Sequence, residues 1–251
     1  MKHERFIKLQ GAFNFRDIGG YTAKDGRKVK WGKLYRSGSL AFLTKSDVEE
    51  MERRRITVDC DLRSSGEQLR TPDKRWNGVK FVSDSFYSEG NDTSVQKKLI
   101  EYQDRLPKIK SYLGRSYQRV ILSSGPQFSI WTLFNEMLNL PEDEALVYHC
   151  AMGKDRTGMM TVMILMCLGL NDKEIMRDYL LSGYTNEVID DDGESELDKK
   201  IDKMNHTQVT QADFYGLTET VRAVWGDFNN FFEYLGFENG DLEKLRDKYL
   251  E

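Results

Sequence analysis

Short apolar runs alternate with longer amphipathic stretches along this chain of 251 residues, a pattern typical of proteins in which strands alternate with helices. Three runs have the length and apolar character of buried strands: 56–62, 79–82 and 145–149. Three helices with start signals are expected: 45–54 after Thr44, 126–140 at Pro126, and 172–181 after Asn171. Strands separated by helices predict an α/β fold of three layers, with a mostly parallel central sheet flanked by helices.

The remaining segments are expected to complete a single domain over residues 1–251, because this length suits one large core. Residues 14–21 and 33–37 are expected to pair as a hairpin around the Asp25-Gly26 turn. Residues 86–125 are expected to be a helical insertion that could act as a lid, with its helix over 93–122 broken at Pro107. Residues 205–251 are expected to form C-terminal helices packed on the domain, with an aromatic series in their core: Phe214, Trp225, Phe228, Phe231, Phe232 and Tyr234.

The most informative stretch is residues 149–158, HCAMGKDRTG, which lies between the strand-like run 145–149 and an apolar helical run. A strand that feeds a short loop opening a helix is an anion-binding device, because backbone N–H groups converge there and the helix N-terminus adds about half a positive charge. Cys150 at the start of this loop is expected to ionise readily, since such settings lower a thiol pKa from ~8.5 into the range of roughly 3.5–7.5. Arg156 can hold a phosphate through two parallel hydrogen bonds. The loop therefore predicts covalent phosphoryl transfer to Cys150.

Other residues of the loop fit the same role. Gly153 permits a positive φ and close backbone approach, Gly158 leaves room for packing against the helix, Lys154 adds a second cation over the anion, and Thr157 places a hydroxyl near the sulfur. The predicted phosphate-binding set is Ala151, Met152, Gly153, Lys154, Asp155, Arg156 and Thr157. A lone cysteine is usually a buried apolar residue, but several matching positions at this spacing favour the functional interpretation.

These residues resemble the cysteine-dependent phosphatases of the tyrosine phosphatase superfamily, and most of all the bacterial atypical branch of tyrosine and lipid phosphatases. Further segments are similar to other blocks of that branch: 14–21, 31–38, 58–64 with Glu67, 178–182 and 234–246. The resemblance implies a protein-tyrosine-phosphatase-like fold and hydrolysis of phosphomonoesters through a cysteinyl-phosphate, without a cofactor or metal. Supporting residues are expected around the loop: Arg16, Asp17, Arg36, Arg63, Glu67, Asp84 and His149.

The proton donor is open at this point. The sequence shows no separate loop with an aspartate beside Trp-Pro, and in the atypical branch the aspartate inside the phosphate loop serves as the acid, which corresponds to Asp155. The alternative role for Asp155 is a structural one, in which it orients Arg63 or Arg36. The competing acids are Asp84, Glu89 and Asp92, which follow the run 79–82.

The substrate is also open. The resemblance implies phosphotyrosine proteins, with phosphoserine or phosphothreonine proteins and phosphoinositides as further substrates, and Lys154 is a feature shared with lipid phosphatases. The alternatives are a catalytically weak phosphate-binding module and a phosphatase of small soluble phosphate esters. A sulfur-transfer or arsenate-reducing enzyme would also use a loop thiolate, but its loop does not normally carry this Gly-Lys-Asp-Arg-Thr-Gly series.

Composition narrows the partners. A net charge of −4 argues against general nucleic-acid binding, so any attraction of anions must be local. Three cysteines (60, 150 and 167) and three scattered histidines show no disulfide or metal pattern, and Cys60 and Cys167 are expected in the core, with a redox partnership of Cys60 and Cys150 as the alternative. The acidic residues of 190–198 are expected to be a solvated loop and not a calcium site. A mean hydropathy of −0.62 and the lack of an apolar leader favour a soluble protein of the cytoplasm, with a non-classical or host-directed export route left open. A monomer is expected, and the oligomeric state is left open.

Overall fold

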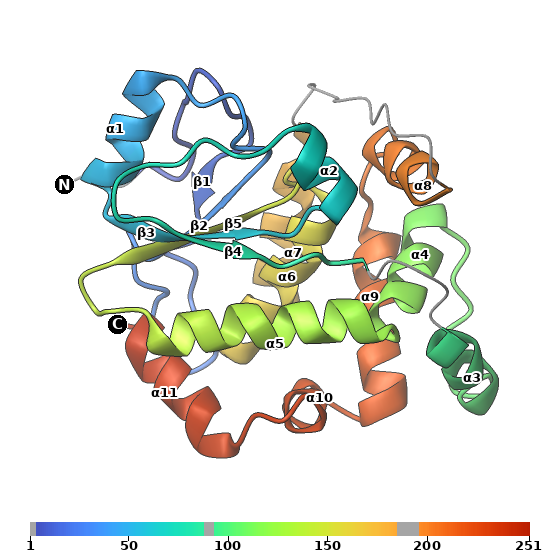
Figure 1. The fold of residues 1–251 in the computed structure, drawn as a ribbon. Coiled ribbons are helices and arrows are strands. Elements are labelled where there is room, and N and C mark those ends of the chain that lie inside the picture. The colour runs from blue at the N-terminus through green and yellow to red at the C-terminus, as the bar shows by residue number, and fades with distance from the viewer. Residues whose placement is uncertain (1–3, 88–92, 185–195) are drawn as a thin grey trace.

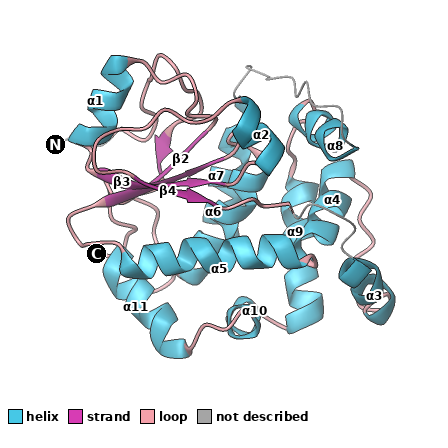
Figure 2. Cartoon of the chain, in the orientation of Figure 1, coloured by secondary structure: helices cyan, strands magenta, loops and turns pink. Residues whose placement is uncertain are grey.

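A five-stranded sheet forms the centre of the fold (Figures 1 and 2), which a computed structural model describes over residues 4–87, 93–184 and 196–251. The strand order is β1-β2-β5-β3-β4, for strands Arg16–Asp17, Leu34–Ser37, Ala145–His149, Ile56–Asp61 and Lys80–Ser83. Only β1 runs antiparallel to its neighbour, and the other pairs are parallel. The predicted α/β class with a mostly parallel sheet is confirmed.

Both faces of the sheet are covered, but unequally. The side chains of β5 alternate between two apolar clusters, because successive residues of a strand point to opposite faces. Leu146 and Tyr148 pack into the larger cluster, and Ala145 and Val147 into the smaller one, together with Trp76. Figure 1 shows α1 (Lys45–Arg53) on one side of the sheet and α5 (Ser124–Asn139) on the other. This confirms the expected three-layer arrangement.

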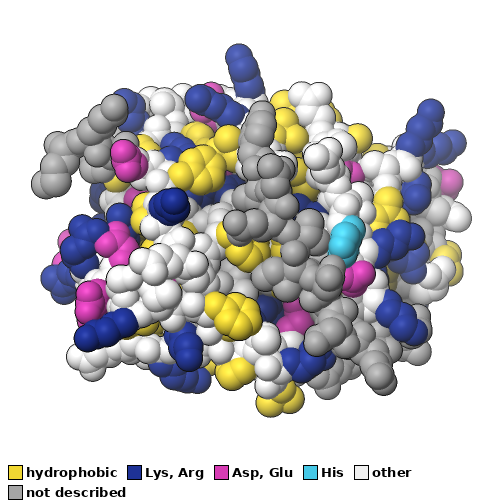
Figure 3. Space-filling model, turned by 90° about the horizontal axis from the view of Figure 1, so that it is seen from above, with side chains coloured by type: hydrophobic (Ala, Val, Ile, Leu, Met, Phe, Trp, Pro, Cys, Tyr) yellow, Lys and Arg dark blue, Asp and Glu magenta, His cyan; other side chains and the backbone are white. Residues whose placement is uncertain are grey.

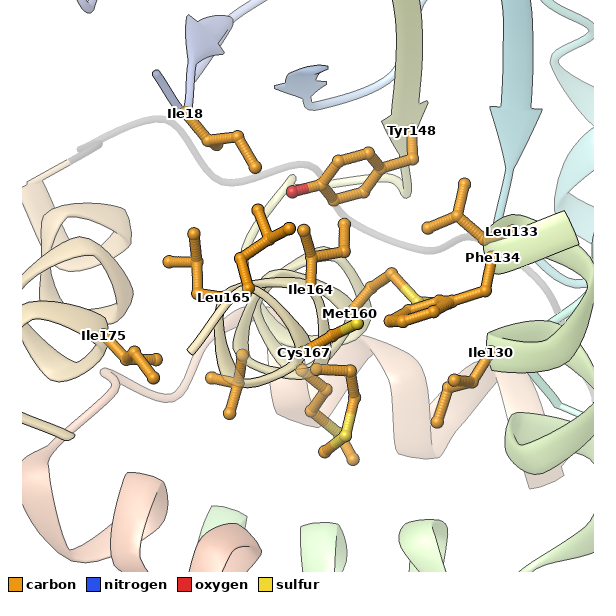
Figure 4. Close-up of a cluster of buried hydrophobic side chains, with 14 of the residues drawn as sticks. Ile18, Ile130, Leu133, Phe134, Tyr148, Met160, Ile164, Leu165, Cys167 and Ile175 are labelled. Carbon is orange, nitrogen blue, oxygen red and sulfur yellow. The ribbon is translucent and has the colours of Figure 1, made fainter. Parts of the chain in front are cut away.

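Helix α6 (Asp155–Cys167) is the centre of the larger cluster, and every one of its residues except Met166 is buried. In Figure 4 its side chains lie between those of the sheet and those of the flanking helices; the labelled residues include Tyr148 from β5, Leu133 and Phe134 from α5, and Ile175 from α7 (Asp172–Leu181). A helix that is apolar all round has no solvent face, so its position is fixed from every side. The N-terminus of α6 is therefore a rigid place for a binding loop.

The expected strands and capped helices are largely confirmed. α1 begins with the capping box of Thr44 and Asp47, and α7 begins after Asn171, whose side chain accepts the Glu174 N–H. Helix α2 (Ser65–Arg70) was not predicted, although a capping box of Ser64 and Glu67 opens it. The hairpin exists, but its first strand is only two residues long.

The reason for the short first strand lies in Asp17. Its carboxylate accepts the N–H groups of Gly19 and Gly32, each at 2.7 Å, which turns the backbone out of the ladder just after β1. The Asp25-Gly26 turn is present, with Gly26 at φ +90° and a bridge between Thr22 and Lys28.

The segment 93–122 is broken around Pro107, as predicted, into α3 (Thr93–Glu101) and α4 (Tyr112–Ile121). Glu196 and Asp198 lie in α8 (Glu196–Asn205), so the prediction of a solvated loop is wrong for these two residues, and residues 190–194 lie outside the described parts. None of the described helices is long and apolar enough to cross a membrane.

The C-terminal residues form α9 (Gln211–Trp225), α10 (Phe228–Tyr234) and α11 (Asn239–Tyr249), whose buried residues join the larger apolar cluster. The aromatic series is mainly core, but the assignment of Tyr234 is wrong, because its side chain is 52% exposed. Cys60 and Cys167 are buried among apolar residues, as expected.

Helix α4 lies against α9 at two glycines. A Cβ on Gly216 would lie 2.8 Å from the Gly114 Cα and 3.1 Å from its carbonyl oxygen. The Gly114 N–H also donates to the Asp213 carboxylate at 2.9 Å. This contact sets the position of α4 because backbone atoms cannot move aside as a side chain can.

We therefore expect Gly216→Ala to lower the free energy of unfolding by about 1–2 kcal/mol, since forcing the helices apart outweighs the better helix propensity of alanine. Gly240→Ala on α11 is the control, because its Cβ would meet no atom within 4 Å and should leave stability unchanged or slightly raised. Urea unfolding measures both. An equal increase in the free energy of unfolding for the two variants would contradict the close contact between α4 and α9.

Candidate active site

Cys150 lies at the carboxyl end of β5, the central strand, and is only 2% exposed. The following residues curl into the N-terminus of α6, whose first helical residue is Asp155. In parallel sheets this end of the strands is the usual ligand-binding edge. The strand, loop and helix predicted from the sequence are thus confirmed in this order.

The carbonyl groups of the loop are bound by the protein. The carbonyl of residue 151 accepts the Ser39 N–H at 2.9 Å. The Asn14 side-chain amide donates to the carbonyls of residues 152 and 153, at 3.3 and 2.8 Å, and the carbonyl of residue 153 also accepts an Arg36 N–H at 2.9 Å. Gly153 has φ +62°, and a Cβ there would come within 2.5 Å of the Ser37 carbonyl oxygen. The two predicted properties of Gly153, a positive φ and a close backbone approach, are both present.

The N–H groups of the same loop show the opposite behaviour. Within the described parts of the chain, the N–H groups of residue 151 and residues 153–156 donate no hydrogen bond to a protein acceptor. They follow Cys150 directly and include the first turn of α6. Unpaired N–H groups in a curled loop at a helix N-terminus form a site for an anion.

Arg16 and Arg36 hold this loop from behind. Both are fully buried and both bind Asp178 of α7, with Arg36 Nη1 at 2.8 Å and Arg16 Nε at 3.3 Å. Burial alone would raise the pKa of Asp178, but the two guanidinium groups hold it at about 2. Each arginine also donates to Ser182 Oγ at 3.0 Å. Arg36 therefore acts on a loop carbonyl directly, and Arg16 acts through Asn14, whose Oδ1 it binds and whose amide donates to the loop carbonyls. Their shared partner Asp178 was not predicted from the sequence.

Arg156 is fixed by Glu67, whose place in the capping box of α2 leaves its carboxylate facing the loop. Arg156 Nη1 and Nη2 donate to the two Glu67 oxygens at 2.6 and 2.8 Å. Burial would raise the pKa of Glu67, but the charge of Arg156 lowers it to about 2. A guanidinium has five N–H donors, so this pair leaves three for a ligand.

Asp155 is bound by a tyrosine of α4. The Tyr117 hydroxyl donates to Asp155 Oδ1 at 2.5 Å and accepts from the Tyr179 hydroxyl at 3.1 Å. Burial raises the pKa of Asp155, although Lys154, Tyr117 and Arg156 oppose the shift. Arg36 and Arg63 have other carboxylate partners, so the alternative in which Asp155 orients either of them is wrong.

Lys154 was predicted to lie over the loop, but its side chain binds the end of α8 instead. Its Nζ donates to three carbonyls at the end of α8 and just beyond, those of Met204, Asn205 and Thr207, at 2.8, 2.7 and 2.6 Å. Lysine is a favourable partner there because the carbonyls at the C-terminus of a helix carry partial negative charge. The prediction that Lys154 is a free cation over the anion is not met in this structure.

His149 belongs to a buried ionic cluster on the other side of the strand end. His149 Nε2 lies 3.3 Å from Asp59 and 3.1 Å from Asp73, and Arg63 binds both Asp61 and Asp73. Burial would lower the pKa of His149, but these carboxylates raise it well above its ordinary value.

Asp59, Asp73 and His149 have ligand atoms within 4.8 Å of one another, a grouping that the scattered histidines of the sequence did not reveal. The residues fit a buried imidazolium and guanidinium that balance three carboxylates. The expected supporting residues Arg63 and His149 thus lie in one cluster, and His149 directly precedes Cys150.

The other candidate residues lie apart from the loop. Asp17 supports the turn after β1, as described above. Asp84 at the end of β4 accepts from Ser129 Oγ at 2.9 Å, and its burial raises its pKa to about 8. No hydrogen bond joins Asp84 to residues 150–156 in the described ranges, and Glu89 and Asp92 fall outside those ranges.

Thr157 is fully buried, and its Oγ1 has no hydrogen-bond partner among the described residues. That hydroxyl is therefore available to a ligand or a neighbouring group, and its place near the sulfur stays a prediction. At the surface, the face seen in Figure 3 carries lysine and arginine side chains scattered among acidic, apolar and neutral ones. This face therefore carries no broad, uniformly positive patch among the residues that the structure describes.

Comparisons with known proteins agree with this geometry. The model of a tyrosine phosphatase family matches residues 7–251. A Cupriavidus necator protein, provisionally named a tyrosine-protein phosphatase, is 27% identical over 69% of this chain, and the match spans 61% of that protein. The triple specificity protein phosphatase PtpB of Mycobacterium tuberculosis is 23% identical over 95% of this chain and 97% of its own. A crystal structure of P. aeruginosa TpbA in complex with pTyr is 13% identical, covers 79% of this chain and 92% of its own, and has a TM-score of 0.34, too low to support an argument.

The pair of Arg156 and Glu67 gives a pH prediction. A carboxyl whose pKa falls from 4.5 to about 2 on folding contributes about 3 kcal/mol of stability, present above pH 4.5 and lost as the pH falls through 2. We expect Glu67→Gln to lower the free energy of unfolding at pH 7 by at least this amount, because it leaves the buried Arg156 unpaired.

The difference in the free energy of unfolding between Glu67→Gln and the unmodified protein should become smaller as the pH is lowered from 4.5. Denaturant unfolding over a pH series measures this difference. Glu136→Gln is the matched control, since Glu136 pairs with the exposed Lys80, and such surface pairs contribute about 1 kcal/mol or less. If the difference in the free energy of unfolding for Glu67→Gln stays constant with pH, the lowered pKa assigned to Glu67 is contradicted.

Proposed function

Because this chain belongs to the tyrosine phosphatase family, we propose that it hydrolyses phosphate monoesters through a cysteinyl-phosphate intermediate on Cys150. The observation that carries the proposal is the loop itself, in which the carbonyls are bound by the protein while the N–H groups of residue 151 and residues 153–156 have no acceptor among the described residues. Such a loop suits the equatorial oxygens of a phosphoryl group.

Arg156 supplies the fixed cation of this site. Glu67 holds two of its N–H groups and thereby sets the plane of the guanidinium, so the remaining donors are presented in one orientation. A donor held in place before the reaction stabilises the transition state without the cost of reorganisation. Phosphoryl transfer depends mainly on such positioning and charge stabilisation.

The reaction has two steps. The Cys150 thiolate attacks phosphorus, the bond from phosphorus to the ester oxygen breaks, and that oxygen leaves with the electron pair and takes a proton. Water then attacks phosphorus, the S–P bond breaks, and inorganic phosphate and the thiolate are released. Thr157, whose hydroxyl has no hydrogen-bond partner in the described ranges, can donate to the sulfur as the thiolate forms again.

We assign the proton to Asp155, which is buried beside the loop and whose pKa burial raises, so that the protonated form needed by a general acid is favoured. In the second step the resulting carboxylate accepts a proton from the attacking water. Asp84 also has a raised pKa, but its carboxylate accepts from Ser129 of α5, and among the described residues no hydrogen bond joins it to the loop.

For the substrate we favour a phosphotyrosine protein. The ring of Tyr87 lies 5.7 Å from the Arg156 guanidinium, so an aromatic side chain borders the cation that would hold the phosphate. The name of the relative PtpB, a triple specificity protein phosphatase, agrees with action on more than one class of phosphorylated substrate. A phosphoinositide is the less favoured substrate, because Lys154, the cation that would suit an inositol headgroup, is bound to the end of α8.

The alternative substrate classes can be distinguished by experiment. A panel of phosphotyrosyl, phosphoseryl and phosphothreonyl peptides, phosphoinositides and small soluble phosphate esters separates them by their kcat/KM values. Turnover of phosphotyrosyl peptides well above the other substrates supports the proposal, and a preference for inositol headgroups or small esters contradicts the substrate assignment.

We expect Cys150→Ser to lose at least about a thousandfold in turnover of para-nitrophenyl phosphate while phosphate still binds, because an un-ionised hydroxyl is a poor nucleophile. Cys167→Ser on α6 is the control, since that cysteine is buried in the core away from the loop, and it should keep activity within a few-fold. Activity of Cys150→Ser within tenfold of the unmodified protein would rule out the covalent mechanism.

We expect Arg156→Lys to lose on the order of a hundredfold or more, because lysine keeps the charge but not the planar fork that Glu67 orients. Arg53→Lys on the exposed surface of α1 is the matched control and should have no effect. Steady-state kinetics with phosphotyrosyl peptide measure both, and a near-normal rate for Arg156→Lys would show that charge alone suffices.

A further inference from the structure

Three buried groups from three different elements meet at Asp155. Tyr117 comes from α4, Tyr179 from α7 and Asp155 from the first turn of α6. Tyr117 is completely buried, Tyr179 is 1% exposed and Asp155 is 4% exposed. The two tyrosine rings meet edge to face, with centroids 6.4 Å apart. The contact is therefore a fixed part of the interior.

The two hydrogen bonds in this group have the same donor-to-acceptor direction, from Tyr179 through Tyr117 to Asp155. Tyr179 donates to the Tyr117 oxygen, and Tyr117 donates its own proton to Asp155 Oδ1. Oδ1 is thus an acceptor, and any proton that Asp155 carries must be on Oδ2. Oδ2 is the oxygen with Lys154 Nζ 3.5 Å away.

We propose that Tyr117 is a positioning residue that fixes the Asp155 carboxyl so that Oδ2 delivers the proton to the leaving oxygen. This inference rests on the proposed function. Tyr117 keeps Oδ1 occupied and holds the plane of the carboxyl against α4. When the proton leaves, the new charge is shared between the Tyr117 hydroxyl at Oδ1 and the Lys154 ammonium beside Oδ2.

The electrostatic surroundings of Asp155 support this role. Burial raises its pKa, and this favours the acid form. Lys154 and Arg156 on its own loop and Tyr117 from α4 lower it again, with Tyr179 from α7 behind Tyr117 and Tyr87 close to the same loop. A hydrogen bond to a carboxylate favours the ionised form. Removal of the Tyr117 hydroxyl should therefore raise the pKa of Asp155.

The fold supplies the precision that this contact needs. The close approach of Gly114 to Gly216 fixes α4 along α9, and Tyr117 lies one turn further along α4. Gly158 on α6 lies with its Cα facing the Tyr179 ring, where a Cβ would be at 3.5 Å. These packing contacts leave Tyr117 and Tyr179 one arrangement relative to the loop.

The test is Tyr117→Phe in the full-length protein, with phosphate esters of poor and good leaving groups, phenyl phosphate and 2,4-dinitrophenyl phosphate. We expect kcat for phenyl phosphate to fall by roughly 10- to 100-fold, the size of a lost hydrogen bond to a charged group. For 2,4-dinitrophenyl phosphate, whose leaving group needs no proton, the change should be under about threefold. The basic limb of the pH profile for phenyl phosphate should move to higher pH, because the acid keeps its proton longer.

Two further variants define the path through Asp155. Asp155→Asn should slow phenyl phosphate by roughly 10²–10⁴ and flatten the basic limb, with little effect on the activated ester. In this background Tyr117→Phe should add little, because the proton it positions is already absent. Tyr179→Phe leaves the bond from Tyr117 to Asp155 in place and should give a smaller change of the same sign.

Tyr148→Phe is the matched control. It removes one buried hydroxyl that also contacts α6, at Thr161 Oγ1 and 2.8 Å, but makes no hydrogen bond to Asp155 among the described residues. We expect it to leave the ratio of the two esters and the pH profile unchanged. Thermal unfolding of every variant checks the fold, and Tyr179→Phe carries the test if Tyr117→Phe does not fold.

The outcomes separate this inference from the function on which it rests. Equal losses on both esters, an unmoved basic limb, or an undiminished Tyr117→Phe effect in the Asp155→Asn background would overturn the role of Tyr117 while Cys150-dependent turnover still stands. If the unmodified protein turns over neither ester, or if Cys150→Ser remains active, then the proposed function itself is wrong and the inference falls with it.

Discussion

The site depends on one constraint: four successive residues at the start of α6 are each held by a different part of the chain. Arg36 of β2 binds the Gly153 carbonyl, the end of α8 binds Lys154, Tyr117 of α4 binds Asp155, and Glu67 of α2 binds Arg156. The loop cannot keep its curl through its own hydrogen bonds, because the N–H groups of residue 151 and residues 153–156 have no acceptor within the described structure. Its shape is thus a product of the whole fold, and the N–H groups are left for an anion.

Buried charge is the means by which these elements are held. Arg16 and Arg36 share Asp178, Arg156 has Glu67, and Arg63 with His149 faces three aspartates. Such pairs add little net stability compared with apolar packing, but they are costly to break singly and they fix orientation. The chain is acidic overall, with a net charge of −4, so this local arrangement must supply the affinity for phosphate.

What the sequence could predict is local. A buried strand, a glycine-containing loop and an apolar helix adjoin in the chain, so their order and the positive φ of Gly153 follow from a short motif. The partners of the loop are distant: Glu67 lies 89 positions from Arg156, Asp178 lies 142 from Arg36, and Tyr117 lies 38 from Asp155. No periodicity encodes such pairs. Lys154 was misplaced for the same reason, because the carbonyls that bind it come from a helix about 50 positions later. By contrast, the Ser64 and Glu67 capping box could have predicted α2, and with it the position of Glu67, from the sequence.

The most direct test of this account is to trap the intermediate. The protein is mixed with a phosphotyrosyl peptide, quenched in acid within the first turnover, digested, and examined by mass spectrometry for a phosphoryl group on the peptide that contains Cys150. The account predicts one phosphoryl group on Cys150, formed in a burst and lost on further incubation. Turnover of the peptide with no phosphoryl group on Cys150, or with the group on another residue, would contradict it.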